Sequence, residues 1–482
     1  MAVLENCEPK RVFYYFEEIC KIPHGSGNTK QISDYLVSFA KAQGLRYIQD
    51  EMNNVIIYKP GTEGYEASPT VILQGHMDMV CEKRADVVHD FTRDGLQLAV
   101  EDGFVHASGT TLGGDDGIAV AYALALLESR DIAHPPLEVV ITVDEEIGLL
   151  GAQGIDCGAL SGKRFINLDS EEEGSLWISC AGGLRGNTKL PVSRTEGEGE
   201  KLSIRIYGLL GGHSGSEIDK IRANADKMMG RLLYGLAREK RYALISLEGG
   251  SKDNAIPREC TSSILAAPED VPEIVKFVEE MGKAWKKEYA RTDEGISVEI
   301  KQEGAFREQV LHPSSQAKVI FFLQNVPDGI QKMSGSIPGL VETSTNLGIL
   351  RLEEKELYAS CGVRSSIQSA RDALSQKIEY LAEFLGGDYT VKGAYPAWEY
   401  REESPLRDLM IRVYREFYGQ EPKVVAIHAG LECGLFYEEM EDLDCVSLGP
   451  NIRDIHTSEE KLDIASTERV WKYLLKVLEA AK

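Results

Sequence analysis

The N-terminal part of the chain alternates between helix-like and strand-like patterns of apolar and polar positions. Residues 26–44 carry apolar side chains at helical spacing, with Ser26 or Asn28 as the expected N-cap and Gly44 as the expected end of the helix. Strand-like runs and one apolar helix follow, the strands at 53–59, 70–75, 137–143 and 164–169 and the helix at 117–129. Apolar strands separated by helices predict an α/β domain with a mainly parallel sheet covered by helices.

The pattern changes at Gly182 and Gly183. Residues 201–208 ("KLSIRIYG") alternate apolar and polar positions, as a half-exposed strand does, and residues 225–240 form an amphipathic helix. Similar mixtures recur at 270–289, 343–366 and 370–387. This part of the chain therefore predicts an α+β domain whose sheet has one covered face.

The parallel-sheet pattern returns near the C-terminus. Residues 423–428 and 444–450 are predicted strands, and a closing helix is expected to begin at Ser466 or Thr467. We therefore expect an α/β domain formed by residues 1–183 and 395–482. An inserted α+β domain is expected at 184–394. A chain of 482 residues is about three times a typical domain length, which also favours two domains.

Composition narrows the class of protein. The chain has 53 Lys and Arg against 77 Asp and Glu, and its net charge of −24 disfavours binding to nucleic acid or to anionic membranes. Its nine cysteines include no CxxC pair, which is typical of reduced thiols. The acidic N-terminus does not resemble a signal peptide, and no run of apolar residues is long enough to span a membrane. We expect a cytoplasmic protein without nucleic-acid or membrane partners.

Polar side chains that could carry chemistry follow the predicted strands. In open α/β sheets ligands bind beyond the carboxyl ends of the strands. Each candidate alone has an ordinary explanation, as a solvated loop, a surface charge run or negative charge at a helix N-terminus. The candidates are His76, Asp78, Asp115, Asp116, Asp144, Glu145, Glu146, Asp169 and His456.

Taken together, two histidines and several carboxylates at the strand ends of one sheet favour a metal site. Zinc takes imidazole nitrogen and carboxylate oxygen as ligands. Two metals about 3.5 to 4 Å apart can share one carboxylate and activate a water for attack on a carbonyl. In this interpretation His76 is a ligand, and the carboxylate of Asp78 accepts the other ring N–H and orients the imidazole.

The motifs closely resemble, in order and over nearly the whole chain, the PepD-type aminoacyl-histidine dipeptidases. These belong to the co-catalytic zinc family that includes peptidase T, carnosinases, aminoacylases and glutamate carboxypeptidases. The resemblance is carried by "GHMDMV", "TTLGGDDGIA", "TVDEEIGLLGA", "FINLDSEEEGSL", "GLLGGHSGSEI", "DNAIPRE", "VRSS", "HAGLECG" and "GPNIRDIHTSEEKL".

The resemblance implies a full set of metal ligands. His76, Asp115 and Asp169 would bind one zinc, and Asp115, Glu146 and His456 the other, with Asp115 as the bridge. Manganese and cobalt remain alternatives to zinc.

The resemblance also implies catalytic and substrate-binding roles. Asp78 would hold His76, and Glu145 would be the general base that takes a proton from a metal-bridging water and delivers it to the leaving amine. His213 would donate to the oxyanion. Arg364 and Asn254 would hold the terminal carboxylate and the backbone of the substrate.

These implications predict a cytoplasmic di-zinc dipeptidase that cleaves unblocked dipeptides, preferentially of Xaa-His type such as carnosine. The inserted domain would act as a lid, with hinges near Gly182 and Pro396, and would mediate homodimerisation. An amidohydrolase acting on N-acyl amino acids or tripeptides is the nearest alternative. A non-catalytic metal-binding scaffold and a two-metal phosphoesterase are alternatives of other classes, and the phosphoesterase accounts poorly for Arg364.

Overall fold

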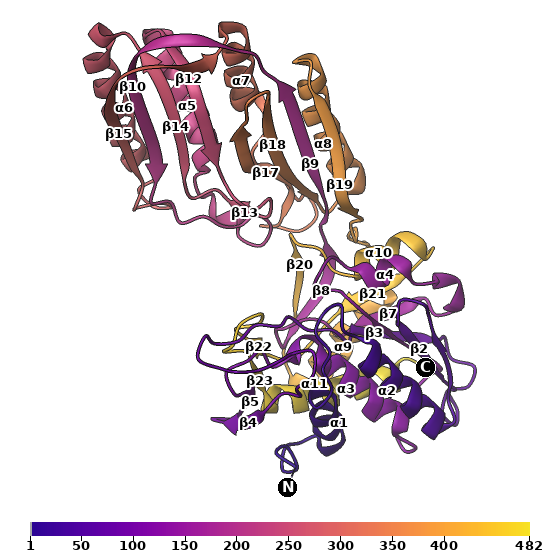
Figure 1. Cartoon of the computed structure of the whole chain (residues 1–482). Coiled ribbons are helices and arrows are strands. Elements are labelled where there is room, and N and C mark those ends of the chain that lie inside the picture. Colours follow the sequence, from indigo (N-terminus) through magenta and orange to yellow (C-terminus); the bar gives the residue numbers. More distant parts are fainter. Residues whose placement is uncertain (1) are drawn as a thin grey trace. The chain divides into compact units, whose positions relative to one another are not determined.

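The chain divides into two compact units in a computed structural model that describes residues 2–482 (Figure 1). The first unit contains the residues up to Cys180 together with Tyr400–Ala426 and Leu431–Lys482, and the second contains Ala181–Glu399 and Ile427–Gly430. The sequence divided the chain at 183/184 and 394/395 and placed 427–430 with the first unit. The structure places residues 427–430 with the second unit, because the N–H of Ala181 donates to the carbonyls of Ile427 and Ala429.

The first unit is built from a large sheet, a small sheet and helices. Its helices are α1 (Lys10–Cys20), α2 (Lys30–Gln43), α3 (Gly114–Glu128), α4 (Leu150–Gly154), α9 (Pro405–Tyr418), α10 (Cys433–Glu439) and α11 (Ile464–Ala480). The large sheet contains β1 (Arg46–Gln49), β2 (Val55–Lys59), β3 (Val71–His76), β6 (Leu137–Thr142), β7 (Arg164–Asn167), β8 (Ser175–Cys180), β20 (Lys423–Ile427) and β21 (Asp444–Ser447). The small sheet contains β4 (Leu98–Glu101), β5 (Phe104–Ala107), β22 (Ile452–Arg453) and β23 (Lys461–Asp463).

The large sheet has eight strands in the order β1-β2-β6-β3-β7-β21-β8-β20. The pairs β6·β3, β3·β7 and β7·β21 are parallel, whereas β1·β2, β2·β6 and β21·β8 are antiparallel. The prediction of a mainly parallel sheet is therefore correct for the four central strands and wrong for the sheet as a whole, which is mixed. The short turn at 50–54 joins β1 to β2 as a hairpin, and a hairpin makes its two strands antiparallel.

Helices pack on this sheet around one apolar core. Helix α3 packs against β3 and α1 against α3, while α9 packs against β21 and α11 against α9. Helix α3 is apolar on all sides, and nearly every residue along it is buried. A helix that is apolar all round must lie inside the protein. It therefore fixes the position of the polar residues at its N-terminus.

Two helix starts differ from the sequence prediction. Helix α2 begins at Lys30 after the N-cap Thr29, so the expected caps Ser26 and Asn28 are wrong, whereas Gly44 ends the helix in the left-handed region (φ 68°) as predicted. The closing helix α11 is capped by the carboxylate of Asp463 rather than beginning at Ser466 or Thr467. The Ser26 hydroxyl does not cap the helix and instead donates to the buried carboxylate of Asp78.

The second unit contains a nine-stranded antiparallel sheet with helices packed on it, which is an α+β arrangement. Its sheet strands are β9 (Gly182–Pro191), β10 (Arg194–Tyr207), β12 (Tyr242–Gly249), β14 (Cys260–Ala266), β15 (Ser297–Leu311), β16 (Gly329–Met333), β17 (Val341–Leu352), β18 (Glu356–Ser365) and β19 (Asp388–Tyr395). Its helices are α5 (Ala225–Glu239), α6 (Val271–Glu288), α7 (Pro313–Asn325) and α8 (Gln368–Phe384), and a separate ribbon pairs β11 (Gly212–His213) with β13 (Ala255–Ile256).

The predicted alternation in this unit is present. Leu202, Ile204 and Ile206 on β10 are buried, whereas Arg205 between them is exposed. The first and last strands of the inserted segment, β9 and β19, pair side by side (Figure 1). This unit therefore has its own apolar core, distinct from that of the first unit.

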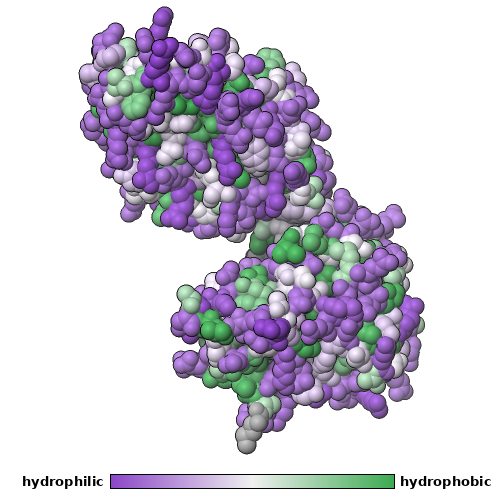
Figure 2. All heavy atoms as spheres, viewed as in Figure 1, coloured by the Kyte–Doolittle hydropathy of each residue, from purple (hydrophilic) through white to green (hydrophobic). Residues whose placement is uncertain are grey.

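The surface agrees with the acidic composition. Hydrophilic residues cover most of the visible face of each unit, with apolar residues scattered among them (Figure 2). Among residues 2–482, none of the helices is both long and apolar enough to cross a membrane.

Candidate active site

Three of the five candidate ligands, His76, Glu146 and Asp169, lie at the carboxyl ends of three adjacent parallel strands, whereas Asp115 lies in the first turn of α3 and His456 between β22 and β23. Strand β3 ends at His76, which pairs in register with Thr142 at the end of β6. The neighbouring strand β7 ends at Asn167, two residues before Asp169. Because parallel strands end at the same edge, His76, Asp169 and the acids that follow β6 gather there.

Asp115 lies between the two histidines. Its backbone is not helical (φ −86°, ψ 104°), although it is in the first turn of α3, and it is buried. Its Oδ1 lies 3.3 Å from Nε2 of His76, and its Oδ2 lies 3.2 Å from Nε2 of His456. One carboxylate thus offers one oxygen to each imidazole, which is the arrangement that a bridging ligand requires.

The remaining predicted ligands complete two groups around Asp115. Oδ1 of Asp169 lies 3.5 Å from Nε2 of His76. Oε1 of Glu146 lies 2.9 Å from Nε2 of His456, and ligand atoms of Asp115, Glu146 and His456 all lie within 4.8 Å of one another. The structure therefore brings together all five residues that the sequence proposed as ligands.

Asp116 is also close to this centre, but it is engaged differently. It forms a group with His76 and Asp169 whose ligand atoms lie within 4.8 Å of one another. However, its Oδ2 accepts the backbone N–H of His76 at 3.2 Å, and a Cβ at Gly75 would clash with the same oxygen. Asp116 thus packs against the backbone of β3, whereas Asp115 faces both histidines.

Asp78 ties the loop after β6 to His76. Its carboxylate accepts the backbone N–H groups of Glu145 (3.0 Å) and Glu146 (3.4 Å) and the hydroxyl of Ser26 (2.8 Å). Nδ1 of His76 lies 3.0 Å from the carbonyl oxygen of Asp78 and 3.4 Å from its Oδ1. The expected orienting role thus falls on the backbone carbonyl first, while the carboxylate fixes the positions of Glu145 and Glu146.

The electrostatics of the cluster suit a cation. Burial lowers the pKa of His76, but the nearby carboxylates, Asp169 first, raise it well above its usual value. Hydrogen bonds to Asp115 and Glu146 raise the pKa of His456 to about 11, while burial raises that of Asp169 to about 7. In the absence of a metal ion, the two imidazoles thus carry protons whose positive charge compensates the negative charge of the carboxylates. A bound metal ion would release these protons, and its own positive charge would then compensate the carboxylates.

Glu145 lies beside this cluster with a strongly perturbed carboxyl. Its side chain keeps some solvent exposure, yet the protein packed around the carboxyl raises its pKa well above the usual range, and the charge of His76 opposes this. A carboxyl with a raised pKa can hold a proton near neutral pH. Glu145 is therefore suited to accept a proton and to give it back.

The substrate-binding residues predicted from the sequence lie together in the second unit. His213 on β11 pairs with Ala255 on β13, directly after Asn254. Arg364 belongs to β18. A Cβ at Gly215 would lie 2.9 Å from Cε1 of His213 and 3.2 Å from Cζ of Arg364, so these two side chains approach the same glycine. No side chain larger than hydrogen fits at position 215 without displacing them.

His213 presents one ring nitrogen as a donor. Its Nδ1 accepts the backbone N–H groups of Gly215 (3.2 Å) and Ser216 (3.1 Å). Burial, and then the charge of Arg364, lower its pKa. The ring is therefore neutral at physiological pH, and its proton is assigned to Nε2 because Nδ1 acts as an acceptor.

His428, to which the sequence assigned no role, belongs to the same cluster. It is buried, and its Nε2 lies 2.7 Å from Oγ of Ser344. Burial and the charge of Arg364 lower its pKa to about 3. Arg364 in turn donates from Nη1 to the hydroxyl of Tyr395 at 2.7 Å. The two histidines thus stay uncharged beside one guanidinium, whose positive charge dominates the cluster.

Comparison with known proteins decides the family. Residues 72–480 match Peptidase family M20/M25/M40. The chain belongs to this family. It is 36% identical over 480 residues to the cytosol non-specific dipeptidase of Escherichia coli (strain K12), and the alignment covers 99% of both chains. The protein is therefore an enzyme, a metallopeptidase.

Solved structures agree with this assignment. The crystal structure of aminoacylhistidine dipeptidase from Vibrio alginolyticus is 36% identical in sequence, with a TM-score of 0.93, and the match covers 99% of this peptidase and 98% of that chain. The aminopeptidase PepT from Bacillus cereus ATCC 10987 shares the fold at 16% identity, with a TM-score of 0.57, over 98% and 99% of the two chains.

A buried polar ladder that sequence reasoning missed lies beneath the candidate ligands of the peptidase. Oε2 of Glu432 accepts from Nε2 of Gln74 (2.5 Å) and from the hydroxyl of Thr142 (2.6 Å). Asn167 donates to Oε1 of Gln74 (2.7 Å) and accepts from Ser447 (2.5 Å). The ladder thus takes one side chain from each of the four central strands. Polar residues inside otherwise apolar strand patterns were the signal in the sequence.

A second missed residue is Glu460, which is buried beside the turn that carries Asp115. It lies in "HTSEE", next to another glutamate, and the sequence does not distinguish the inward residue of such a pair.

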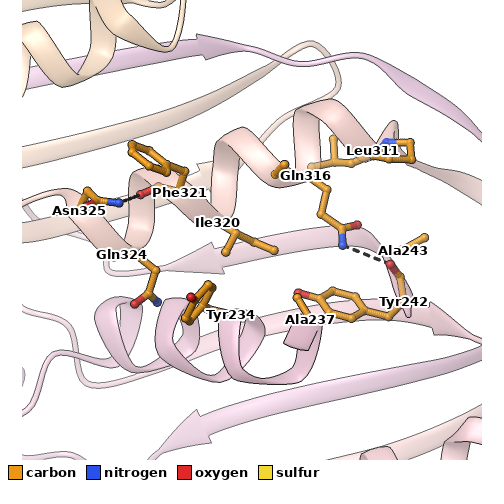
Figure 3. A pocket seen from close by; sticks show the side chains of 12 residues that line it. Tyr234, Ala237, Tyr242, Ala243, Leu311, Gln316, Ile320, Phe321, Gln324 and Asn325 are labelled. Atoms are coloured by element: carbon orange, nitrogen blue, oxygen red, sulfur yellow. Dashed lines mark hydrogen bonds between the residues drawn. The ribbon is translucent and has the colours of Figure 1, made fainter. Parts of the chain in front are cut away.

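The second unit of the peptidase also contains an open groove of about 670 Å³ between α5, β12 and α7 (Figure 3). Tyr234, Tyr242 and Phe321 line it, and Nε2 of Gln316 donates to the carbonyl of Tyr242 at 3.1 Å. None of its lining residues carries a charge or a metal-binding side chain. The groove therefore offers no hydrolytic chemistry.

Proposed function

We propose that this metallopeptidase hydrolyses unblocked dipeptides, preferentially of Xaa-His type such as carnosine, at a centre for two divalent metal ions. The observation that carries the proposal is the position of Asp115, with one carboxylate oxygen directed at His76 and the other at His456. The names of the two relatives at 36% identity, a cytosol non-specific dipeptidase and an aminoacylhistidine dipeptidase, support the substrate class.

The donor set fits the proposed ions. His76, Asp115 and Asp169 would hold one ion, and Asp115, Glu146 and His456 the other. Imidazole nitrogen and carboxylate oxygen suit zinc, with manganese and cobalt as alternatives. When bound, two such ions polarise a peptide carbonyl and lower the pKa of a water molecule.

Glu145 would move the proton. Its carboxylate accepts a proton from the attacking water, and its raised pKa lets it hold that proton until the nitrogen of the leaving amine takes it. The hydrogen bond from the Glu145 N–H to Asp78 keeps this part of the loop in a fixed position. Asp78 thus acts on both His76 and the base.

The second unit would supply the groups that recognise the substrate. We assign to Nε2–H of His213 a hydrogen bond to the developing oxyanion, because the neutral ring keeps its proton on that nitrogen. The guanidinium of Arg364 pairs with the terminal carboxylate through two parallel donors, which a lysine cannot provide. Asn254 holds the substrate backbone.

The proposal includes a cytoplasmic location and a homodimer. The relative from Escherichia coli is described as cytosolic, which supports the location. The second unit exposes Tyr234 and Phe321 on α5 and α7, and exposed aromatic side chains favour self-association through this unit. Light scattering on the purified protein measures the mass: a value near twice 53.3 kDa supports the dimer, and one near 53.3 kDa excludes it.

The test compares β-Ala-His, Gly-His and N-acetyl-Gly-His as substrates for the metal-stripped protein before and after zinc is added. We expect zinc-dependent release of histidine from the two unblocked peptides only. Glu145→Gln should lower its rate by about 10²- to 10⁴-fold, whereas Glu172→Gln, a change at an exposed acid on the loop after β7, should not. Cleavage of the blocked peptide alone would move the substrate class to N-acyl amino acids. Zinc binding without any hydrolysis would favour a non-catalytic scaffold.

A further inference from the structure

Glu460 holds the turn that carries Asp115. Its side chain is buried (3% exposed). Oε2 accepts the backbone N–H groups of Leu112 (2.8 Å) and Gly113 (3.2 Å), and Oε1 accepts those of Gly114 (2.8 Å) and Asp115 (3.3 Å). One carboxylate from the far end of the chain thus binds four consecutive N–H groups.

These donors need an acceptor that the turn itself lacks. The first N–H groups of a helix have no partner within the helix, and a side chain at the N-cap usually accepts one of them. The N-cap of α3 is Gly113, which has no side chain. Glu460 replaces the missing cap, and its negative charge is favourable at a helix N-terminus.

Glu460 also belongs to the segment that carries His456. The N–H of Glu460 donates to the carbonyl of Thr457 at 3.2 Å, which closes a turn between the two residues. Directly after Glu460, β23 pairs with β5 and anchors the segment in the small sheet. The short stretch 456–460 therefore determines the position of His456 directly and that of Asp115 through the four hydrogen bonds.

We propose that Glu460 is a positioning residue of the metal centre, which holds the backbone of residues 112–115 so that the Asp115 carboxylate stays between His76 and His456. This inference rests on the proposed two-metal function and names a residue that acts through Asp115. Both oxygens of the Glu460 carboxylate are engaged by backbone N–H groups, so they are not directed at the ions. Glu460 therefore affects the affinity of the centre for metal ions through the position of Asp115.

The substitution Glu460→Gln tests the proposal with little change of volume. The amide that it introduces has one acceptor oxygen, so only one pair of N–H groups could keep its partner. The NH₂ group of the amide would face the N–H groups of the other pair. The turn would then be free to move away from the histidines, and Asp115 with it.

The experiment titrates metal-free protein with Zn²⁺ against a chromophoric chelator and compares the wild type with Glu460→Gln and Glu459→Gln. Outer residues that orient ligands contribute 10- to 100-fold to metal affinity, so we expect Glu460→Gln to weaken zinc binding by at least about tenfold. Glu459→Gln removes the same charge from an exposed neighbour and should change the affinity by less than about twofold.

Two further measurements separate positioning from a general structural role. Hydrogen exchange of metal-free protein should be faster in Glu460→Gln at the amides of residues 112–115, while the melting temperature stays within a few degrees of the wild type. In kinetics at saturating zinc, kcat should fall with little change in KM. If Glu460→Gln does not fold, Glu460→Asp, which withdraws the carboxylate by one methylene, is titrated in its place with the same expectation.

The outcomes are distinct. Zinc affinity equal to that of the wild type in the folded Glu460 variant overturns the inference, as does an equal loss in Glu459→Gln, which would mean a general charge effect. If the wild-type protein binds no zinc, manganese or cobalt, the proposed function itself fails. Weakened binding in Glu460→Gln with faster exchange at 112–115 supports positioning.

Discussion

Asp226 offers a prediction about stability that follows from burial alone. It lies in the first turn of α5 and is 0% exposed, and the thiol of Cys260, a weak donor that lowers its pKa, is the side chain that interacts with its carboxylate. Burial raises its pKa well above the usual value. The weak thiol donor does not offset the cost of burying an ionised carboxylate, so the folded protein holds Asp226 protonated.

The sign of the pH dependence follows from this shift. Below the ordinary pKa of aspartate, near 3.9, Asp226 is protonated in both the folded and the unfolded chain, so its ionisation makes no contribution to the free energy of unfolding. Above it the unfolded chain ionises while the folded protein does not. The free energy of unfolding therefore falls by about 1.4 kcal/mol for each pH unit until the raised folded pKa is reached.

Asp226→Asn removes this cost without changing the size of the side chain. We expect the variant to be more stable than the wild type at pH 7, and we expect its advantage to grow between pH 5 and pH 7 by up to about 2.7 kcal/mol. Urea unfolding of both proteins at the two pH values measures the difference. Asp219→Asn, at a half-exposed acid of the same unit, is the control and should show no such growth. An advantage that is the same at both pH values, or a less stable variant, would refute the reasoning.

Three further predictions concern the site. Glu145→Gln should lower kcat by about 10²- to 10⁴-fold while zinc binding is retained, as steady-state kinetics and metal analysis would show; retention of kcat would remove Glu145 as the base. Arg364→Lys should lower kcat/KM for a free dipeptide by roughly ten- to a hundredfold through loss of the two-donor contact, but should affect the corresponding dipeptide amide much less; equal losses on both would contradict carboxylate recognition. Gln74→Leu should leave the buried amide of Asn167 without its acceptor and remove one of the two donors to Glu432, and so lower the free energy of unfolding by about 1 to 3 kcal/mol in urea titrations; an unchanged midpoint would argue against the ladder as a stabilising network.

The sequence predicted the elements of the first unit better than their arrangement. The apolar runs at 70–75 and 137–143 are strands β3 and β6, because strongly apolar runs flanked by polar residues have few other solutions. The direction of a strand leaves no such mark. The pattern of apolar and polar residues at 53–59 is compatible with a strand parallel or antiparallel to β6. The hairpin that joins β1 to β2 decides the direction.

The side chains of the candidate site could be predicted from the sequence, whereas the contacts made by backbone groups could not. His76, Asp115, Glu146, Asp169 and His456 were named as ligands, and the structure brings them together. Backbone partners have no signature of their own. The carbonyl that lies nearest to Nδ1 of the first histidine and the four N–H groups that Glu460 accepts became visible only in the structure.

The two candidate clusters, the carboxylates of the first unit and Arg364 with its neighbours in the second, carry opposite charge, and this difference has a physical reason. The first unit gathers carboxylates whose negative charge attracts cations, and within it a guanidinium close to Asp115 or Glu146 would compete with those cations for the same oxygens. Arg364 belongs to the second unit, where its neighbours are the uncharged rings of His213 and His428. There it keeps its positive charge available for an anionic substrate group. Because Arg364 belongs to the second unit and the candidate metal ligands to the first, Arg364→Lys should weaken substrate binding and leave zinc affinity unchanged. Glu460→Gln should weaken zinc binding with little change in substrate affinity.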